Sequence, residues 1–531
     1  MDQQSAPPGP APGRRAGSGT RSLAVLLASP ASGALLALST PPWDLVPAVW
    51  VALAVLYGLL LEEQPPSSRF LRLAAGSLRG LLFGAGTNLV ALRFVVPVVS
   101  RFTPLPWAVG LAALVLLSLE QGLRFAAAAM LTIQLARRGV PRWLAFGAGV
   151  YLSTFIPCVF PWTVATGLVP FPALLQLAEV FGERGVSALV AASAALAVEG
   201  ARALRAPGPR GRGWALLGGA AGIPAVLLVQ GLLATRAVEA QRRDSPRARV
   251  ALLQPSIEAT ERWDPAEAAH ILERLAALTR TAEEEVPPPD LTVWTEGSYP
   301  YLVDARARYD TRGPRAILQP GVRGPLLVGL MMRGAGGVYN SAAVVRDGRI
   351  SEPYHKSHLL IFGEYVPFGE TFPWLNEVFY RGTGLLRGTR PVRLDAGPIR
   401  AVALNCYEDT LSYAVQEAMK VEPNLLVNIT NDAWYTGSME SELHLRLATP
   451  RAIEVRRDMV RAVNYGETTW VDATGRVRAR YDGDAPGILR TEPALLATRT
   501  PYARTGDAPW VALSLAGVAF FLWRGRKASS S

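Results

Sequence analysis

The sequence Arg400-Ala-Val-Ala-Leu-Asn-Cys-Tyr-Glu-Asp409 decides the fold expected for the second half of this chain. Its apolar run, Ala401 to Leu404, is too short for a helix and ends in polar residues, so it predicts a short buried strand. Reactive groups in α/β folds gather at strand ends, and Cys406 follows this strand directly. A lone cysteine is more often a small buried apolar side chain than a nucleophile. The role of Cys406, one of two cysteines in 531 residues, therefore depends on its partners.

Two other places in the chain put a charged side chain after a short apolar run. Glu296 ends the run Leu291-Thr-Val-Trp-Thr295, and Gly297 after it allows a sharp turn. Lys356 lies in Tyr354-His-Lys-Ser-His358, in a chain with only three lysines among 54 basic residues. A lysine retained where arginine is otherwise used indicates a compact ammonium group whose charge matters, and chance placement is the alternative.

Five short motifs surround these residues and follow one another between residues 294 and 434. They are Trp294-Thr-Glu296, Tyr354-His-Lys-Ser-His-Leu359, Phe362-Gly-Glu-Tyr-Val-Pro367, Asn405-Cys-Tyr-Glu408 and Asn431-Asp-Ala-Trp434. Together they resemble the motifs of the apolipoprotein N-acyltransferases, membrane-anchored bacterial members of the nitrilase superfamily. The resemblance implies a catalytic triad of Glu296, Lys356 and Cys406 on a four-layer αββα sandwich. It also implies an activity: a phospholipid gives its sn-1 acyl chain, through a cysteine thioester, to the amino terminus of S-diacylglyceryl-cysteine apolipoproteins.

The residue types suit this chemistry. A free thiol is mostly protonated at neutral pH, so it needs a base or a neighbouring cation. Glu296 can take the thiol proton and later deliver one to the leaving group. Lys356 can hold positive charge beside the thiolate and the oxyanion, and the backbone N–H of Tyr407 can supply a second oxyanion donor.

The resemblance assigns further residues around the triad. It implies supporting roles for two acids, Glu364 and Glu408, which as bare sequence would more often be solvated surface carboxylates. We assign substrate binding to four aromatic residues, Trp263, Trp434, Phe362 and Tyr365, with ordinary core packing as the alternative. The aromatic segments 359–362 and 368–380 predict a lid that contacts lipid.

One stretch departs from the family pattern. After Asn-Asp-Ala-Trp the family usually continues with Phe-Gly and then Gly-Pro or Ala-Pro before Gln-His. This chain has Tyr435-Thr-Gly-Ser-Met-Glu-Ser-Glu-Leu-His444 instead. We expect this altered loop to bear on substrate preference and not on the triad.

The first half of the chain has the composition of a membrane domain. Crossing a bilayer takes about 20 apolar residues, and eight segments are candidates: 22–40, 43–61, 76–99, 106–135, 143–162, 185–201, 214–235 and 508–523. Basic clusters precede the first segment and follow the second, fourth, sixth and eighth, which puts them all on one side, the cytoplasm. The soluble region between the last two segments then faces the periplasm. Charged residues inside spans line a cavity or reach the interface, and there are four here: Arg79, Arg93, Glu120 and Arg124.

We therefore predict a polytopic helical membrane domain of about eight spans that carries an α/β domain. Its parts are a disordered cytoplasmic tail (1–20), seven transmembrane helices (21–237), a periplasmic nitrilase-like catalytic domain (238–505), and a last transmembrane helix with a cytoplasmic tail (506–531). Both termini would lie in the cytoplasm of a bacterium, with the protein in the inner membrane. The expected strands are 249–257, 291–295, 325–332, 339–345, 399–405, 425–429 and 459–463, with helices at 266–281 and 413–421.

The composition of the chain indicates which classes of partner it binds. The formal charge of +11 lies largely at the ends of apolar segments, which fits membrane topology better than nucleic-acid binding. With four histidines, no Cys/His cluster and no glycine-rich phosphate loop, we expect no metal and no cofactor. The expected partners are a phospholipid donor, a diacylated apolipoprotein acceptor and the membrane. Two alternatives remain, a membrane-tethered amidohydrolase that uses water as the acceptor and an inactive membrane scaffold.

Overall fold

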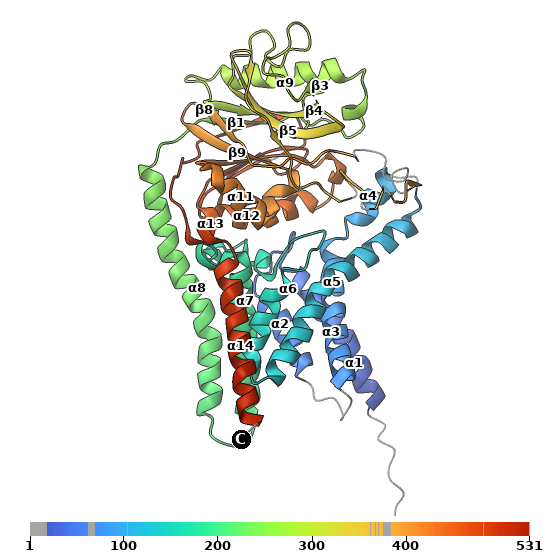
Figure 1. The fold of residues 1–531 in the computed structure, drawn as a ribbon, viewed down its shortest axis with the longest axis vertical. Helices are drawn as coiled ribbons and strands as arrows, with labels where there is room; N and C mark the ends of the chain where they lie inside the picture. The colour runs from blue at the N-terminus through green and yellow to red at the C-terminus, as the bar shows by residue number, and fades with distance from the viewer. Residues whose placement is uncertain are drawn as a thin grey trace, which may run out of the picture.

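The computed structural model describes residues 18–61, 69–102, 105–361, 363–366, 368–369, 371–374, 384–481 and 483–529. It shows a helical body at one end of the long axis and a domain of two sheets at the other (Figure 1). The chain enters the sheet domain from α8 (Gly211–Asp244) and leaves it through α14 (Ala508–Ser529). Of the predicted tail 1–20, only residues 18–20 are described, and they begin α1 (Ser18–Ala37).

The helical body is built from consecutive helices that pack as neighbours. Besides α1, α8 and α14, it contains α2 (Ala48–Leu60), α3 (Arg69–Ala91), α4 (Val95–Phe102), α5 (Trp107–Arg137), α6 (Arg142–Ser153), α7 (Ala178–Arg205) and the 3-10 turns Val164–Leu168 and Pro172–Leu175. Small residues let these helices approach closely. A Cβ at Gly33 or Gly86 would lie within 2.1 Å of a carbonyl oxygen of the facing helix, Phe83 or Pro30.

Each of the eight predicted spans overlaps a helix of this body, but the number of spans stays a prediction. Among the described residues, α5, α7 and α8 are long and apolar enough to cross a membrane. Helices α3 and α4, which meet at a bend of 56°, make a fourth span if the two together are counted as one span. The segments at 24–37, 48–60 and 508–521 are apolar but shorter. The predicted segment 143–162 is helical only to Ser153 and continues in turns.

The charged residues predicted inside spans make local contacts. Arg124 donates from Nε to the Ile156 carbonyl (2.9 Å) and from Nη1 to the Trp162 carbonyl (3.1 Å), which closes the turn after α6. Arg79 donates to the Leu59 carbonyl of α2, and the Arg93 guanidinium lies 4.9 Å from the centre of the Trp43 ring. Arg93 also donates from Nη1 to the Val90 carbonyl at 3.1 Å, so all three arginines satisfy backbone carbonyls at helix ends or in the turns that follow them.

The second part contains two mixed sheets. The first has the strand order β14-β1-β2-β4-β5-β6, with β3 on β4 and β7 on β5, and the second has the order β13-β12-β11-β10-β9-β8. Strands β1 (Val250–Gln254), β2 (Leu291–Val293), β4 (Leu326–Gly334), β5 (Gly337–Arg346), β9 (Ile399–Asn405), β10 (Leu425–Asn431) and β11 (Met459–Asn464) correspond to the predicted ones, which are confirmed. The additional strands are Leu302–Asp304, Arg349–Ile350, Tyr354–His355, Arg393–Ala396, Thr469–Val471, Val477–Arg480 and Gly487–Thr491 (β3, β6, β7, β8, β12, β13 and β14).

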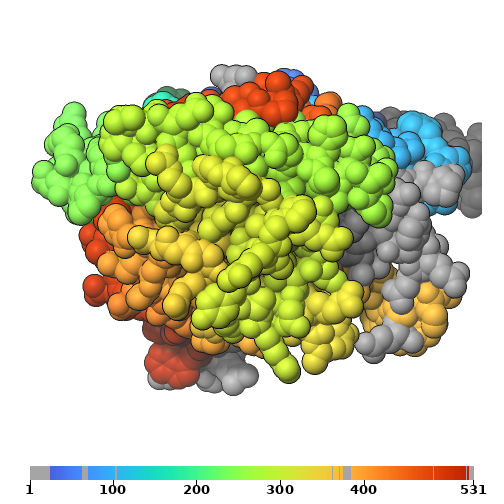
Figure 2. All heavy atoms as spheres, turned by 90° about the horizontal axis from the view of Figure 1, so that it is seen from above, coloured from blue at the N-terminus to red at the C-terminus, as the bar shows by residue number. Residues whose placement is uncertain are grey.

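Alternation along the strands places the sheets in four layers. In β9, Ala401 and Ala403 face the other sheet, while Val402 and Leu404 face the helices α11 (Ser412–Ala418) and α12 (Glu440–Val455). Helix α9 (Ala268–Glu283) covers the outer face of the first sheet. The predicted αββα order is thus present, and residues between 250 and 350 form most of the face turned away from the helical body (Figure 2).

Helix α12 is buried on both sides because it lies between the second sheet and the helical body (Figure 1). Leu445 and Ala448 pack on the sheet side, and Leu443, Leu447 and Ile453 join the core of the helical body. Two buried faces leave no polar stripe, so the amphipathic pattern that would have predicted this helix is absent from its sequence.

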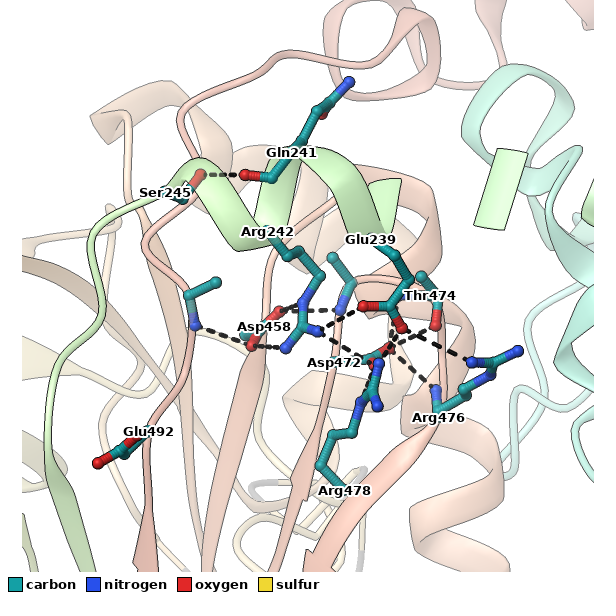
Figure 3. A network of polar contacts seen from close by, with 12 residues as sticks. Glu239, Gln241, Arg242, Ser245, Asp458, Asp472, Thr474, Arg476, Arg478 and Glu492 are labelled. Carbon is teal, nitrogen blue, oxygen red and sulfur yellow. Dashed lines mark hydrogen bonds and ion pairs between the residues drawn. The ribbon is translucent and has the colours of Figure 1, made fainter. Parts of the chain in front are cut away.

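Ion pairs join the end of α8 to the sheet domain (Figure 3). Arg242, 3% exposed, donates to both carboxylate oxygens of Asp458 at 3.0 and 2.8 Å and lies 3.6 Å from Asp472. Asp458 also accepts from the Ala473 and Ala494 backbone N–H groups, each at 3.0 Å. A bidentate, buried arginine of this kind fixes orientation, so α8 holds the sheet domain at a set position over the helical body.

Candidate active site

The predicted nucleophile lies in a tight turn at the end of β9. Cys406 begins the 3-10 turn Cys406–Thr410 with φ +52°, a left-handed conformation that costs a non-glycine residue energy. The Asn428 amide compensates by donating to the Cys406 carbonyl at 2.9 Å and to the Leu404 carbonyl at 3.0 Å. Cys406 is half-buried as a residue, so the turn is open on one side, as a nucleophile that must meet a substrate requires.

Glu408 holds this turn together from inside. Its carboxylate accepts the backbone N–H groups of Asn405, Ser357 and His358, each at 2.9 Å, and the Tyr354 hydroxyl at 2.7 Å. Burial alone would raise the pKa of Glu408, but hydrogen bonds from His358, the Lys356 charge and the backbone N–H groups hold it below its usual value. The predicted supporting residue therefore ties the Cys406 turn to the segment that carries Lys356.

Replacing Glu408 by alanine is expected to destabilise the folded protein by about 3 kcal/mol or more, because buried N–H donors lose a charged acceptor. Because the folded-state pKa lies below the unfolded value, this stabilisation is present above pH 4.5 and is lost as the pH falls through the folded-state pKa. Thermal unfolding in detergent measures the loss. Glu417→Ala is the control, since among the described residues this 45% exposed carboxylate pairs only with exposed Lys420. An equal shift in both variants would contradict the role given to Glu408.

Lys356 lies at the centre of the site, 1% exposed, between two carboxylates. Its Nζ donates to Glu296 Oε1 at 3.1 Å and to Glu364 Oε1 at 3.0 Å, and lies 2.9 Å from Glu364 Oε2. Burial lowers the pKa of the ammonium group, but the charges of Glu296, Glu364 and Cys406 raise it well above its usual value. Lys356 therefore keeps its positive charge at neutral pH.

Glu296 approaches from the end of β2, opposite Lys356. Burial raises the pKa of its carboxyl, Lys356 opposes this, and Glu364 adds to it, so the net direction is upward. The turn can pass this close to β4 because residue 329 is glycine: a Cβ there would lie 2.2 Å from the Thr295 carbonyl oxygen. A carboxyl with a raised pKa beside a thiol suits a group that takes and returns a proton.

The structure brings the three predicted triad residues into one site. Burial raises the pKa of the Cys406 thiol, the negative charge of Glu296 raises it further, and the Lys356 ammonium opposes both. The thiol is therefore protonated at rest and depends on a base and a cation at the moment of attack.

The structure describes four of the other predicted site residues, Glu364, Tyr365, Tyr407 and Trp434. Glu364 also accepts the Leu360 N–H at 2.8 Å, and the Tyr365 ring lies 4.7 Å from the Arg387 guanidinium. Tyr407 follows Cys406 in the turn, where the first N–H groups of a helical segment have no intrahelical partner. Trp434 follows the end of β10 and is partly exposed. Phe362 and the side chain of Trp263 lie outside the described residues.

Asn340 is a site residue that sequence reasoning missed. Its amide Nδ2 donates to Glu296 Oε1 at 2.8 Å and to Glu364 Oε1 at 3.0 Å, and its Oδ1 accepts from the Asn405 amide at 3.3 Å. Its backbone carbonyl also accepts the Lys356 N–H at 2.8 Å. The available signal was an amide inside the predicted strand 339–345, directly before Ser341 and the apolar run 342–345, where a buried polar side chain needs partners.

The altered loop at 435–444 lies between the site and the helical body. The Tyr435 ring packs edge-to-face on Phe94 with ring centres 5.7 Å apart, and the Thr436 carbonyl accepts from Arg101 of α4 at 3.0 Å. Its last residue, His444, meets Asp409 with Nε2 2.9 Å from Oδ1. This loop thus connects the turn of Cys406 to the first helices of the chain.

Two family models match the chain. Residues 249–495 match the carbon-nitrogen hydrolase model, and residues 32–196 match the apolipoprotein N-acyltransferase N-terminal domain. The sandwich with its buried acid, lysine and thiol thus defines a protein of the carbon–nitrogen hydrolase class, the nitrilase-like domain predicted from the motifs. An amidase from Nesterenkonia sp. AN1, solved with acrylamide added at its active-site cysteine, is 18% identical and covers 50% of this chain and 98% of its own, with a TM-score of 0.37.

Full-length relatives narrow the class to a family. The apolipoprotein N-acyltransferase of Geobacter metallireducens is 30% identical over 93% of this chain and 94% of its own, and that of Brucella melitensis is 33% identical over 91% of each. The chain belongs to the apolipoprotein N-acyltransferase family. The recognition made from the five motifs is confirmed, and with it the prediction of an acyltransferase of lipoprotein biosynthesis.

Proposed function

We propose that this protein moves the sn-1 acyl chain of a phospholipid, by way of a Cys406 thioester, to the amino terminus of S-diacylglyceryl-cysteine apolipoproteins. The observation that carries the proposal is Lys356, buried between Glu296 and Glu364 and within electrostatic reach of the Cys406 sulfur. Hydrolysis and transfer need the same triad, and the N-terminal half of the chain, which belongs to the same family, favours transfer between lipid substrates.

In the first half-reaction, the Cys406 sulfur attacks the ester carbonyl carbon while Glu296 takes the thiol proton. The carbonyl oxygen becomes an oxyanion that the Lys356 ammonium and the Tyr407 N–H stabilise. The carbon–oxygen bond then breaks, and Glu296 returns the proton to the departing lysophospholipid alcohol. The enzyme is left with a thioester.

In the second half-reaction, the neutral N-terminal amine of the apolipoprotein attacks the thioester carbonyl. Glu296 takes a proton from the attacking nitrogen, the same donors hold the oxyanion, and the carbon–sulfur bond breaks. The proton on Glu296 passes to the departing sulfur, which restores the free enzyme. Both halves therefore use one base and one oxyanion site.

We place the sheet domain in the periplasm and both termini in the cytoplasm of a bacterium, in the domain arrangement expected from the sequence. The basic turn between α7 and α8, with Arg202, Arg205, Arg210 and Arg212, and the C-terminus lie at the end of the helical body away from the sheets (Figure 1). The exposed aromatics of the predicted lid, Phe368, Phe372 and Trp374 (74, 50 and 60% exposed), support contact with lipid chains near the site.

An acyl-enzyme experiment tests this function. The purified full-length protein is mixed with phosphatidylethanolamine vesicles that carry a labelled sn-1 chain, and its intact mass is followed. We expect one labelled acyl chain per protein, stable without acceptor and discharged at least tenfold faster when a diacylated lipopeptide with a free amine is added. Discharge at the same rate in water alone would indicate the amidohydrolase alternative, and the absence of any adduct would indicate an inactive scaffold.

A further inference from the structure

Three ionisable side chains outside the triad meet where β10 ends and α12 begins. Asp432 follows β10, Glu440 is the first residue of α12, and His444 lies one turn further along that helix. The spacing of four residues puts Glu440 and His444 on the same helix face. All three are buried, with 1, 7 and 4% of the side chain exposed, and one ligand atom from each lies within 4.8 Å of the others.

The hydrogen bonds around this cluster leave two oxygens aimed into it. Asp432 Oδ2 accepts the Ser441 hydroxyl at 2.6 Å, but among the described residues Asp432 Oδ1 and Glu440 Oε2 accept no hydrogen bond. His444 Nδ1 is 3.6 Å from Asp432 Oδ1, too far for a hydrogen bond. Buried carboxylate oxygens without partners are costly, so a ligand between them would remove an energetic penalty.

The other nitrogen of His444 is already held in place. Nε2 lies 2.9 Å from Asp409 Oδ1, and the second oxygen of Asp409 pairs with the buried Arg461. A histidine that donates its far N–H to a carboxylate, and so presents its near nitrogen as a lone pair, is the usual support of a metal ligand.

The charged groups around this cluster also favour a bound cation. With Asp409 paired to Arg461, the cluster gathers two carboxyl groups, Asp432 and Glu440, and His444 is the single positive partner that the described ion pairs give Asp432. A divalent cation bound to neutral His444 would neutralise both carboxylates. Acidic residues at a helix start are also favoured by the helix dipole, but that effect is a surface one and does not explain burial beside a second acid.

We propose that Asp432, Glu440 and His444 bind a divalent transition-metal ion and that this ion pins the start of α12 to the end of β10. One imidazole nitrogen and two carboxylate oxygens match the ligand preference of Zn²⁺, with a fourth position left for water. No Cys/His pattern in the sequence marks this site, because two of its ligands are acids and one lies on a different element. Asp432 and His444 fall on the family pattern, whereas Glu440 stands in the altered stretch, so only this third ligand belongs to the chain's departure from the pattern.

Metal binding to the full-length, chelator-stripped protein in detergent tests the proposal. We expect about one equivalent of Zn²⁺ per chain by titration calorimetry and elemental analysis, with a Zn²⁺-dependent rise in the unfolding temperature. Glu440→Gln should weaken binding at least tenfold and remove that rise. Glu442→Gln is the matched control: it lies two residues on, pairs with Arg446 and Arg480, and should bind Zn²⁺ within twofold of the unaltered protein.

Two further variants distinguish zinc binding at this cluster from zinc binding at the thiol and from a failure to fold. Zn²⁺ also binds thiolates, so Cys406→Ala is measured in parallel and should retain the site. Binding lost in Cys406→Ala but kept in Glu440→Gln would assign the ion to the thiol and overturn the proposal, as would less than 0.2 equivalents, on the order of noise, in the unaltered protein. If Glu440→Gln does not fold, Asp432→Asn carries the same expectation.

Discussion

Cys406→Ala is expected to abolish acyl transfer, with a loss of about 10⁴-fold or more, since Cys158, the other cysteine, lies in the helical body and cannot replace the thiol beside Glu296 and Lys356. The same variant should show no acyl adduct after incubation with labelled phospholipid vesicles, as measured by intact-protein mass. Its unfolding temperature should change little, because the replacement removes only a sulfur atom at a partly exposed residue and leaves the Glu296–Lys356 ion pair in place. The prediction thus separates loss of chemistry from loss of fold.

The matched control for this variant is the second cysteine. Cys158 lies in the turns after α6, in the helical body, and is partly buried like Cys406. Cys158→Ala should keep the acyl adduct and nearly full transfer. Transfer that survives Cys406→Ala, or that disappears equally in Cys158→Ala, would rule out the nucleophile assigned here.

Replacing Lys356 by methionine is expected to have the second largest effect. The variant loses an oxyanion partner, which costs about 10²–10³-fold in kcat. It also leaves Glu296 and Glu364 buried without their shared cation, which destabilises the fold by about 3–5 kcal/mol. Transfer rates and thermal unfolding, measured on the same preparation, should therefore both fall.

Lys420→Met provides the control, because this lysine is 72% exposed and its one ion pair in the described part of the chain is with the exposed Glu417. It should leave rate and unfolding temperature nearly unchanged. A Lys356→Met protein that transfers acyl chains at the normal rate would show that the oxyanion is stabilised elsewhere. One that unfolds normally would show that the two carboxylates share a proton when the lysine is absent.

Much of the sheet domain could be predicted from the sequence because its strands carry a local signal. Strands such as β9 and β10 are short apolar runs that end in polar residues, and their side chains alternate between two buried faces. The strands that sequence reasoning passed over, such as β6 and β7, have two residues each, too few to show a period. Length limited the prediction for these two strands, whereas the longer β13 and β14, with four and five residues, are half-buried or exposed along most of their length and lack a buried run.

In the helical body the sequence predicted that helices exist but not where each one begins and ends. Apolar composition marked every helix, but it did not mark where each helix ends: the run at 43–61 becomes helical only at Ala48, and α3 and α4 bend by 56° between Ala91 and Val95. A run of Ala, Leu and Gly is equally apolar whether the helix starts early or late and whether it is straight or bent, so mean hydropathy does not reveal these boundaries. The number of spans therefore remains a prediction of the sequence.

By itself the sequence determined the family and the alternation of strands and helices, and it predicted the triad whose three residues the structure brings into one site, because each is encoded by residue type and short-range order. Tertiary structure decided the surroundings: Asn340 between the two acids, Gly329 beneath the Glu296 turn, and Asp432 with Glu440 and His444 across two elements. These contacts join residues distant in the chain, and their energy depends on burial and on the charges that face one another. No local pattern carries that information, since burial and facing charges exist only after the layers have packed.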